Sequence, residues 1–284
     1  MTDRARRKVE TGSPKLAREA APGEGFVSEM FCSLQGEGPF VGERQVFLRT
    51  AGCTATCWWC DTVYSKMETP RFVIHDPDKR VLANPLGVEA VLDEVVAFAR
   101  ANAPVRTVSI TGGEPLEQPE FTRALARGVK ERGFRVYLET NGVHPQALEA
   151  MLEWVDVIAM DIKLPSAIGT EEWEAHAGFL GVLAGTRFDP ESPGAVAGGV
   201  FVKVVVDDRS GIEEIERAAA TVAGFSRRVP LVLQPESGTL LSERAPREVA
   251  ERLMRRLGEA QQMALARLDD VRIVPQCHKI LKIR

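Results

Sequence analysis

Residues 45–62 read QVFLRTAGCTATCWWCDT, an apolar run followed directly by a loop with three cysteines. The first six residues favour a β-strand, because apolar and β-branched side chains are enriched in strands. Cys53, Cys57 and Cys60 follow with the spacing C-x3-C-x2-C, which can turn three thiolates toward one side of a short loop. The chain holds five cysteines, an odd number, and this clustering indicates metal ligation in a reducing compartment rather than disulfide bonds.

Strand and helix patterns alternate along the rest of the chain. Further strands are expected at 106–110, 135–139, 157–162, 200–206, 230–234 and 271–274. Apolar residues recur with helical spacing over 88–99 and 121–129, and helices are also expected over 211–223 and 246–265. This repetition predicts an α/β fold with a parallel sheet and right-handed crossovers. About six β/α units are too few for a closed eight-stranded barrel, so we expect a partial, open TIM-like barrel.

The composition sets the limits of this domain. The 284 residues are 44% hydrophobic and 27% charged with a net charge of −4, which excludes disorder throughout and any global attraction for nucleic acid. Residues 1–25 carry few large apolar side chains and are interpreted as a flexible tail, although their arginines also suit RNA or an acidic partner. The domain proper is expected over 26–284, with insertions lacking clear strands near 64–86 and 166–198.

No apolar run approaches the roughly 18 residues of a membrane helix, and no segment resembles a secretory signal. We therefore expect a cytoplasmic protein without a membrane partner.

Polar motifs follow five of the expected strands. They are the cysteine loop, TGGEP at 111–115, ETNG at 139–142, DIKLPS at 161–166 and QPESG at 234–238. Ligands of parallel α/β proteins bind at the carboxyl ends of the strands, so we expect all five loops at one rim.

The three clustered cysteines allow more than one kind of site. A structural zinc ion needs a fourth ligand, for which Cys32, Cys277 or His278 are candidates. An iron–sulfur cube held by three cysteines instead leaves one iron open to an exogenous ligand. Cysteines that only pack as small apolar groups are the third interpretation.

The cysteine spacing followed by GGEP resembles the radical S-adenosylmethionine (radical SAM) superfamily. This resemblance implies a [4Fe-4S] cluster on Cys53, Cys57 and Cys60, whose open iron is chelated by S-adenosylmethionine. An electron from the cluster then cleaves this cofactor to a 5′-deoxyadenosyl radical. Gly112 and Gly113 are free to adopt a positive φ and let the main chain approach a ligand, and Glu114 is expected to meet the cofactor ammonium. A plain Gly-Gly turn before a helix near residue 119 is the alternative.

Three further motifs, SLQGEG at 33–38, CDT at 60–62 and PQCHK at 275–279, resemble the 7-carboxy-7-deazaguanine synthase family over about residues 26–281. The resemblance implies a lyase of queuosine and deazapurine biosynthesis, which converts 6-carboxy-5,6,7,8-tetrahydropterin to 7-carboxy-7-deazaguanine with loss of ammonia. It also implies a magnesium ion, a reductant such as flavodoxin or ferredoxin, no direct contact with nucleic acid, and a homodimer.

Site residues are carried over by their match to these motifs. Substrate contacts are expected from Leu34, Gln35, Gly36, Glu37, Arg49, Thr111 and His278, of which Glu37, Arg49 and Thr111 are the catalytic candidates. Cofactor contacts are expected from Trp59, Asp61, Gly112, Gly113, Glu114, Lys163, Leu164, Pro165, Ser166, Gln234, Pro235, Glu236 and Ser237, and Thr62 is the expected magnesium ligand. Glu139 and Asn141 are candidates for cofactor or backbone contacts.

Several of these residues also have purely structural interpretations. Asp161 and Lys163 can form an ordinary ion pair, Thr62 can cap a turn, and His278 can be a structural histidine. Cys277 is interpreted as packing, His75, His144 and His176 as structural, and an approach of Arg284 to the substrate as doubtful.

Two other functions remain open at this point. Another radical SAM reaction, such as a glycyl-radical activase or a peptide-modifying enzyme, would share the cysteines and GGEP. A zinc-stabilised binding module that uses the basic tail on RNA is the non-enzymatic alternative.

Overall fold

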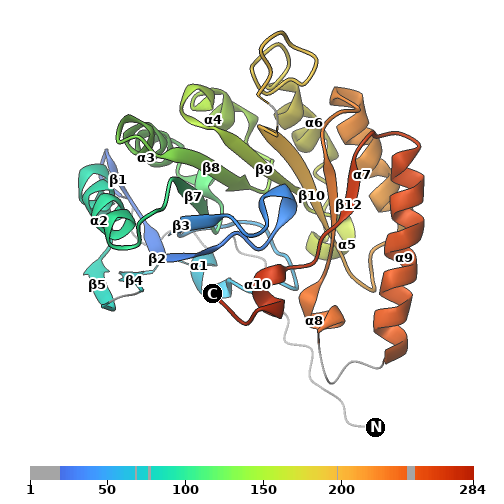
Figure 1. Cartoon of the computed structure of the whole chain (residues 1–284), viewed down its shortest axis with the longest axis horizontal. Helices are drawn as coiled ribbons and strands as arrows, with labels where there is room; N and C mark the ends of the chain where they lie inside the picture. Colours follow the sequence, from blue (N-terminus) through green and yellow to red (C-terminus); the bar gives the residue numbers. More distant parts are fainter. Residues whose placement is uncertain (1–19, 68, 76–77, 197, 242–246) are drawn as a thin grey trace.

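The computed structural model describes residues 20–67, 69–75, 78–196, 198–241 and 247–284. Its centre is a curved ten-stranded sheet with the order β12-β11-β10-β9-β8-β7-β3-β2-β4-β5 (Figure 1). The seven strands from β12 to β3 pair in parallel. The sheet ends on two different strands, β12 and β5, so the partial, open barrel expected from the strand pattern is confirmed.

All seven expected strands are present. They are β3 (Arg44–Thr50), β7 (Thr107–Gly112), β8 (Arg135–Thr140), β9 (Val157–Ile162), β10 (Val200–Val206), β11 (Leu231–Pro235) and β12 (Val271–Ile273). Strands buried on both faces read as largely apolar runs, which made most of these segments visible in the sequence; β12, with the exposed Arg272, is buried less completely.

The structure adds strands that the sequence did not indicate. They are β1 (Glu24–Gly25), β2 (Val27–Leu34), β4 (Arg71–Ile74), β5 (Arg80–Ala83) and β6 (Leu86–Gly87). The expectation that 64–86 lacks strands is therefore wrong, because β4 and β5 form a hairpin that extends the sheet beyond β2. The expected tail also ends earlier than residue 25, since β1 pairs with β6; residues 1–19 lie outside the described part of the chain.

The expected helices are α2 (Val88–Ala101), α3 (Pro119–Glu131), α7 (Ile212–Phe225) and α9 (Arg247–Leu265). The others are α1 (Val63–Lys66), α4 (Pro145–Glu149), α5 (Pro165–Ile168), α6 (Trp173–Gly181), α8 (Ser237–Leu240) and α10 (Cys277–Ile280), with short 3-10 turns at Gly38–Phe40, Pro115–Glu117 and Leu152–Trp154. Helices α2, α3, α4, α6, α7 and α9 follow one side of the curved sheet (Figure 1). Among the described residues, no helix is long and apolar enough to cross a membrane.

The core positions the site. One large cluster of buried side chains fills the space between the sheet and its helices, and includes Leu48 of β3 and Leu92 of α2. A second, smaller cluster contains Tyr137, Phe201 and Val232, with Phe40 packed against it. With the strands fixed in this way, the loops at their carboxyl ends meet around one cavity.

Candidate active site

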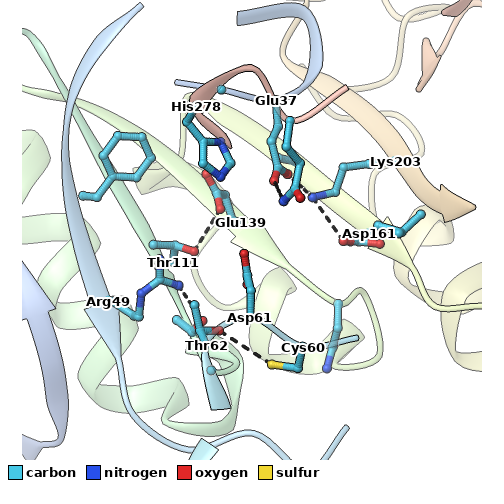
Figure 2. Close-up of a pocket in the computed structure, with 18 of the residues that line it drawn as sticks. Glu37, Arg49, Cys60, Asp61, Thr62, Thr111, Glu139, Asp161, Lys203 and His278 are labelled. Atoms are coloured by element: carbon cyan, nitrogen blue, oxygen red, sulfur yellow. Dashed lines mark hydrogen bonds and ion pairs between the residues drawn. The ribbon is translucent and has the colours of Figure 1, made fainter. Parts of the chain in front are cut away.

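A cavity of about 670 Å³ lies at the carboxyl ends of the strands. Each of the five loops expected at one rim contributes to its wall, which confirms that expectation. Of the expected site residues, those that line it are Leu34, Gln35, Gly36, Glu37, Arg49, Cys53, Cys57, Trp59, Cys60, Asp61, Thr62, Thr111, Gly112, Gly113, Glu114, Lys163, Gln234 and His278. Figure 2 labels residues of the wall that come from several strands and from the cysteine loop.

Six expected cofactor residues do not line this cavity: Leu164, Pro165, Ser166, Pro235, Glu236 and Ser237. Several of their polar groups have partners in the protein, whereas Ser166 Oγ is buried without one. The main-chain N–H of Ser166 donates to Glu214 at 2.9 Å, and the Glu236 carboxylate caps α8 by accepting from the N–H groups of Gly238 and Thr239. Their contact with a cofactor stays a prediction.

The three cysteines of the loop after β3 all line the cavity and are free thiols of intermediate exposure. Burial, with the nearby charges of Glu114 and Glu117, raises the pKa of Cys53 to about 12. Coordination of a metal would displace this proton, because a coordinating thiol is deprotonated.

The donor set distinguishes a cube from a zinc site. Within the described residues, no three His, Cys, Asp or Glu side chains lie close enough to hold one metal ion. Cys32 packs against the core and Cys277 Sγ lies 3.5 Å from the Pro275 carbonyl oxygen; neither lines the cavity. A closed zinc site requires four ligands on one ion, whereas a cube binds each thiolate through a different iron, so the three cavity cysteines fit the cube.

Gly112 and Gly113 bring the GGEP loop against the cysteine loop. The Gly113 N–H donates to the Thr50 carbonyl at 3.1 Å, and the Glu114 N–H donates to the Gly52 carbonyl at 2.6 Å. A Cβ on Gly113 would lie 1.9 Å from the Gly52 oxygen, and one on Gly112 would lie 2.3 Å from Thr50 Oγ1. Neither glycine has a positive φ, so that part of the expectation is wrong: close backbone packing requires them.

Glu114 joins the GGEP loop to the ETNG loop. Its carboxylate accepts hydrogen bonds from Thr140 Oγ1 at 2.7 Å and from the main-chain N–H groups of Asn141 at 2.7 Å and Leu116 at 3.0 Å. Burial raises the pKa of Glu114 to about 7 despite these bonds. The contact expected between this carboxylate and the cofactor ammonium stays a prediction, because these three donors already hold it.

Orphaned polar atoms line the part of the cavity near the cysteines. Trp59 Nε1, Asp161 Oδ1 and Gln234 Oε1 are buried without a hydrogen-bond partner. Lys163 Nζ lies 2.7 Å from Asp161 Oδ2 and 4.7 Å from the centre of the Trp59 ring, so the ion pair weighed from the sequence is present. Because buried polar groups are normally satisfied, these three atoms fit a polar cofactor bound beside the cysteine loop.

A buried ion-pair chain forms another wall, and sequence reasoning missed two of its members. Lys203 of β10 pairs with Glu37 and lies 3.2 Å from Asp161, while Gln276 Nε2 donates to Glu37 Oε1 at 2.7 Å (Figure 2). Burial opposes ionisation of Glu37, but the charge and hydrogen bonds of Lys203 and Gln276 outweigh it and lower the pKa of Glu37 to about 2. A lysine inside the apolar strand VFVKVVV was the available signal.

Glu139 ties together two expected substrate residues. Its carboxylate accepts from Gln35 Nε2 at 2.9 Å and from Thr111 Oγ1 at 2.9 Å. His278 packs on Gly36, where an added Cβ would lie 2.1 Å from its Nδ1, and burial lowers the pKa of His278. The imidazole is therefore held in the wall of the cavity, as the substrate-contact interpretation requires.

Arg49 lies in the same wall, fixed by two acceptors. Its Nε donates to Glu29 Oε1 and its Nη1 to the Gly112 carbonyl oxygen, both at 3.0 Å. Glu29 also accepts from Tyr64 and Arg284, which sequence analysis did not assign to the site. Arg284 lines the cavity, and its contact with the substrate, which the sequence left doubtful, is not tested by this position.

Thr62 precedes α1 without capping it through its side chain. Its Oγ1 lies 3.7 Å from Cys60 Sγ and lines the cavity, so the side-chain cap considered from the sequence is not formed. Asp61 Oδ2 pairs with Lys279 Nζ at 2.8 Å, which links the cysteine loop to α10.

The four histidines separate by position. His75 contacts Glu29 behind the cavity wall, and His176 is buried with Nε2 3.2 Å from the Asn141 carbonyl oxygen. Neither they nor His144 line the cavity, in accord with the structural interpretation.

A family model and the sequences of known proteins both match this chain. The family model described as Radical SAM superfamily matches residues 47–171. The chain is 36% identical over 260 residues to a 7-carboxy-7-deazaguanine synthase of Geobacter sulfurreducens, covering 90% of this chain and 96% of the relative. It is 35% identical over 261 residues to the protein of the same name from Methanopyrus kandleri, covering 90% and 92% of the two chains.

Solved structures show the same fold. The crystal structure of QueE from Escherichia coli superposes with a TM-score of 0.54 at 20% identity, covering 90% of this chain and 95% of that one. A structure of TYW1 with a lysine-pyruvate adduct bound gives a TM-score of 0.52 at 13% identity, covering 79% and 74% of the two chains.

Proposed function

The chain belongs to the 7-carboxy-7-deazaguanine synthase family and is a radical SAM enzyme, and from that premise we propose that it converts 6-carboxy-5,6,7,8-tetrahydropterin to 7-carboxy-7-deazaguanine with loss of ammonia. The radical SAM superfamily implies a [4Fe-4S] cluster and S-adenosylmethionine. The observation that carries the proposal is that one cavity holds both the three cysteines and a wall of fixed donors, acceptors and cations.

The cofactor half of the cavity is formed by this chain's own groups. Cys53, Cys57 and Cys60 would hold the cluster, and Trp59, Asp161 and Gln234 offer the unpartnered polar atoms beside it. When bound, the cluster and S-adenosylmethionine supply a carbon-centred radical that removes a hydrogen atom from the substrate.

The substrate half fits a flat heterocycle with an amide-like edge and one carboxylate. Gln35 and Glu37 present amide and carboxylate groups to the ring, and the ion pair with Lys203 keeps Glu37 ionised as an acceptor. Arg49 presents a guanidinium, whose planar donors match a carboxylate. Because these groups are already bonded to the protein, they hold the substrate in a fixed orientation, and the enclosing wall keeps water from the reacting carbon.

Product formation tests this proposal. The protein is reconstituted with iron and sulfide without oxygen and incubated with dithionite, S-adenosylmethionine and 6-carboxy-5,6,7,8-tetrahydropterin. Mass spectrometry is expected to detect 7-carboxy-7-deazaguanine and an equal amount of ammonia, with no product from the Cys57→Ala protein. Cleavage of S-adenosylmethionine without deazapurine product would contradict the proposal and indicate another radical SAM reaction.

We further propose that Thr62 Oγ1 binds a magnesium ion that also contacts substrate oxygens. The hydroxyl faces the cavity and makes no cap bond to α1, and hard oxygen ligands suit Mg²⁺. Thr62→Ala should abolish the stimulation of turnover by added MgCl₂, whereas Thr62→Ser should retain it. Equal stimulation of all three proteins would contradict this assignment.

The remaining partners follow from the chemistry. Each cleavage of the cofactor needs one low-potential electron, so we propose flavodoxin or ferredoxin as donor and a reducing cytoplasm as the location. Trp58 of the cysteine loop is 43% exposed, which leaves the loop accessible to such a donor. The homodimer expected from the resemblance stays a proposal that sedimentation velocity checks.

A further inference from the structure

Glu29 occupies a position in the wall that the proposed function leaves unexplained. It lies within β2 and is only 5% exposed, yet four side chains from four separate segments contact its carboxylate. Arg49 Nε donates to Oε1 at 3.0 Å and Tyr64 Oη to Oε1 at 2.7 Å. Arg284 Nη1 lies 2.9 Å and His75 Nε2 lies 3.0 Å from Oε2.

These contacts keep the carboxylate charged. Burial opposes ionisation, but the hydrogen bonds from Tyr64 and Arg49 and the charges of both arginines outweigh it, so the pKa of Glu29 is lowered. One buried anion thus holds two guanidinium groups on neighbouring parts of the cavity wall. Truncating such an anion would leave the arginines to repel each other.

Both guanidinium groups have N–H donors that form no hydrogen bond within the described residues. Arg49 uses Nε for Glu29 and Nη1 for the Gly112 carbonyl, and Arg284 uses Nη1 alone. Among the described residues, no hydrogen bond is formed by Nη2 of either arginine. A ligand carboxylate has two oxygens and is well suited to donors that converge from two sides.

The segment that carries Arg284 is attached to the same wall. The Cys277 N–H donates to the Gly36 carbonyl at 2.8 Å, and Ser33 Oγ donates to the Arg284 carbonyl oxygen at 2.5 Å. Residues 277–284 therefore lie along the β2 loop that contributes the expected pterin contacts, and they carry His278 as well as Arg284.

We propose that Glu29 is a positioning residue that pairs Arg49 with Arg284, so that both guanidinium groups bind the carboxylate of the substrate. Arg284 is then a second specificity-determining residue for a carboxylated pterin, beyond Arg49. This inference rests on the proposed function and adds to it how a carboxylated substrate is distinguished from an uncharged one.

The test compares two pterins that differ only at carbon 6, where one carries a carboxylate and the other a methyl group. Anaerobic calorimetry measures binding of 6-carboxy-5,6,7,8-tetrahydropterin and of 6-methyl-5,6,7,8-tetrahydropterin to the reconstituted protein with S-adenosylmethionine present. Arg284→Ala and Glu29→Gln should each weaken binding of the carboxylated ligand at least tenfold and change binding of the methylated one less than twofold. The side chain of Arg284 is 51% exposed, so we expect Arg284→Ala to fold. This variant therefore tests the inference even if Glu29→Gln fails to fold.

Glu94→Gln is the matched control. It removes a carboxylate that pairs with Arg80 on the surface, away from the cavity, and should leave both affinities unchanged. Equal weakening of both ligands by Arg284→Ala would show a merely structural role and overturn the inference, as would no weakening at all. A wild-type protein that binds neither pterin would instead overturn the proposed function, and the inference with it.

Discussion

Arg49 and Cys57 line the same cavity, and under the proposed function they are expected to perform separable tasks. Cys57 belongs to the loop that would hold the cluster, whereas Arg49 extends from β3 and is fixed by Glu29 and the Gly112 carbonyl. Removal of a ligand should destroy the cluster, and removal of the guanidinium should affect only the substrate. The two functions of the site can therefore be separated by single substitutions.

Cys57→Ala is expected to lose the iron–sulfur absorption and all cleavage of S-adenosylmethionine. Arg49→Ala should retain the cluster, and it should also retain the slow cleavage of S-adenosylmethionine that occurs without substrate. Its KM for the pterin should rise at least tenfold, since a charge-assisted hydrogen bond contributes about 1.5–3 kcal/mol. Iron analysis and steady-state kinetics measure both effects. A cluster-free Arg49→Ala protein would contradict the placement of this arginine.

His176 gives a prediction for the stability of the protein as a function of pH. Burial lowers its pKa from 6.5 to about 4, so between these values the unfolded chain binds a proton that the folded chain does not. Its contribution to stability is present above pH 6.5 and is lost as the pH falls toward 4. Between pH 7.5 and pH 5 the free energy of unfolding should fall by about 2 kcal/mol through this residue.

Chemical denaturation of the cluster-free protein measures this difference at the two pH values. His176→Gln keeps a donor for the Asn141 carbonyl and cannot titrate. Its free energy of unfolding should therefore fall by about 2 kcal/mol less than that of the wild type between the two pH values. An identical fall in both proteins would show that His176 titrates normally in the folded state.

Sequence and structure agree best for residues inside short motifs. Cys53, Cys57 and Cys60 are recognised by their spacing along the chain, and Arg49 lies within a strand that its apolar neighbours identify. Glu29 and Lys203 lie outside these motifs, and Gln276 lies inside PQCHK, but the partners of all three lie far away along the chain. Only the fold brings Lys203 to Glu37, 166 residues away.

At the scale of elements, the site depends on how tightly the loops after β3 and β7 approach each other. The N–H groups of Gly113 and Glu114 donate to the carbonyl oxygens of Thr50 and Gly52. The cysteine loop would have a different position if this approach were wider, and the cavity would lose its shape.

Gly113→Ala should therefore lower the stability of the folded protein and its content of bound cluster. The added Cβ would lie 1.9 Å from the Gly52 carbonyl oxygen, and overpacking of this kind costs about 1–3 kcal/mol. Gly258→Ala in α9 is the control, because its Cβ meets no atom within 4 Å and a helical alanine stabilises by up to about 1 kcal/mol. Thermal unfolding and iron content measure both; an unchanged Gly113→Ala protein would contradict the tight approach.

Most of the parallel strands were predictable because they are buried on both faces, although edge strand β12 has the exposed Arg272. The long helices were predictable because their apolar residues repeat along one face. Strand β2 was not, because it runs antiparallel to β3 and its sequence VSEMFCSL shows no clear alternation. Helix α6 was missed in a region interpreted as an insertion, although Trp173, His176, Phe179 and Leu180 form its buried face.

At the scale of the whole molecule, the open barrel brings the cysteine loop and a chain of buried ion pairs to one cavity. The cysteine loop follows β3, while the ion-pair chain of Glu37, Lys203 and Asp161 draws on β9, β10 and the loop after β2 (Figure 2). Under the proposed function, the carbon at position 6 of the pterin must meet the radical directly.

Transfer of a deuterium label measures that contact most directly. The reconstituted protein is incubated without oxygen with dithionite, S-adenosylmethionine and 6-carboxy-5,6,7,8-tetrahydropterin deuterated at carbon 6. Mass spectrometry should find deuterium in S-adenosylmethionine or 5′-deoxyadenosine at a level that rises with product formation. Deazapurine product accompanied by an unlabelled adenosyl group would contradict the account.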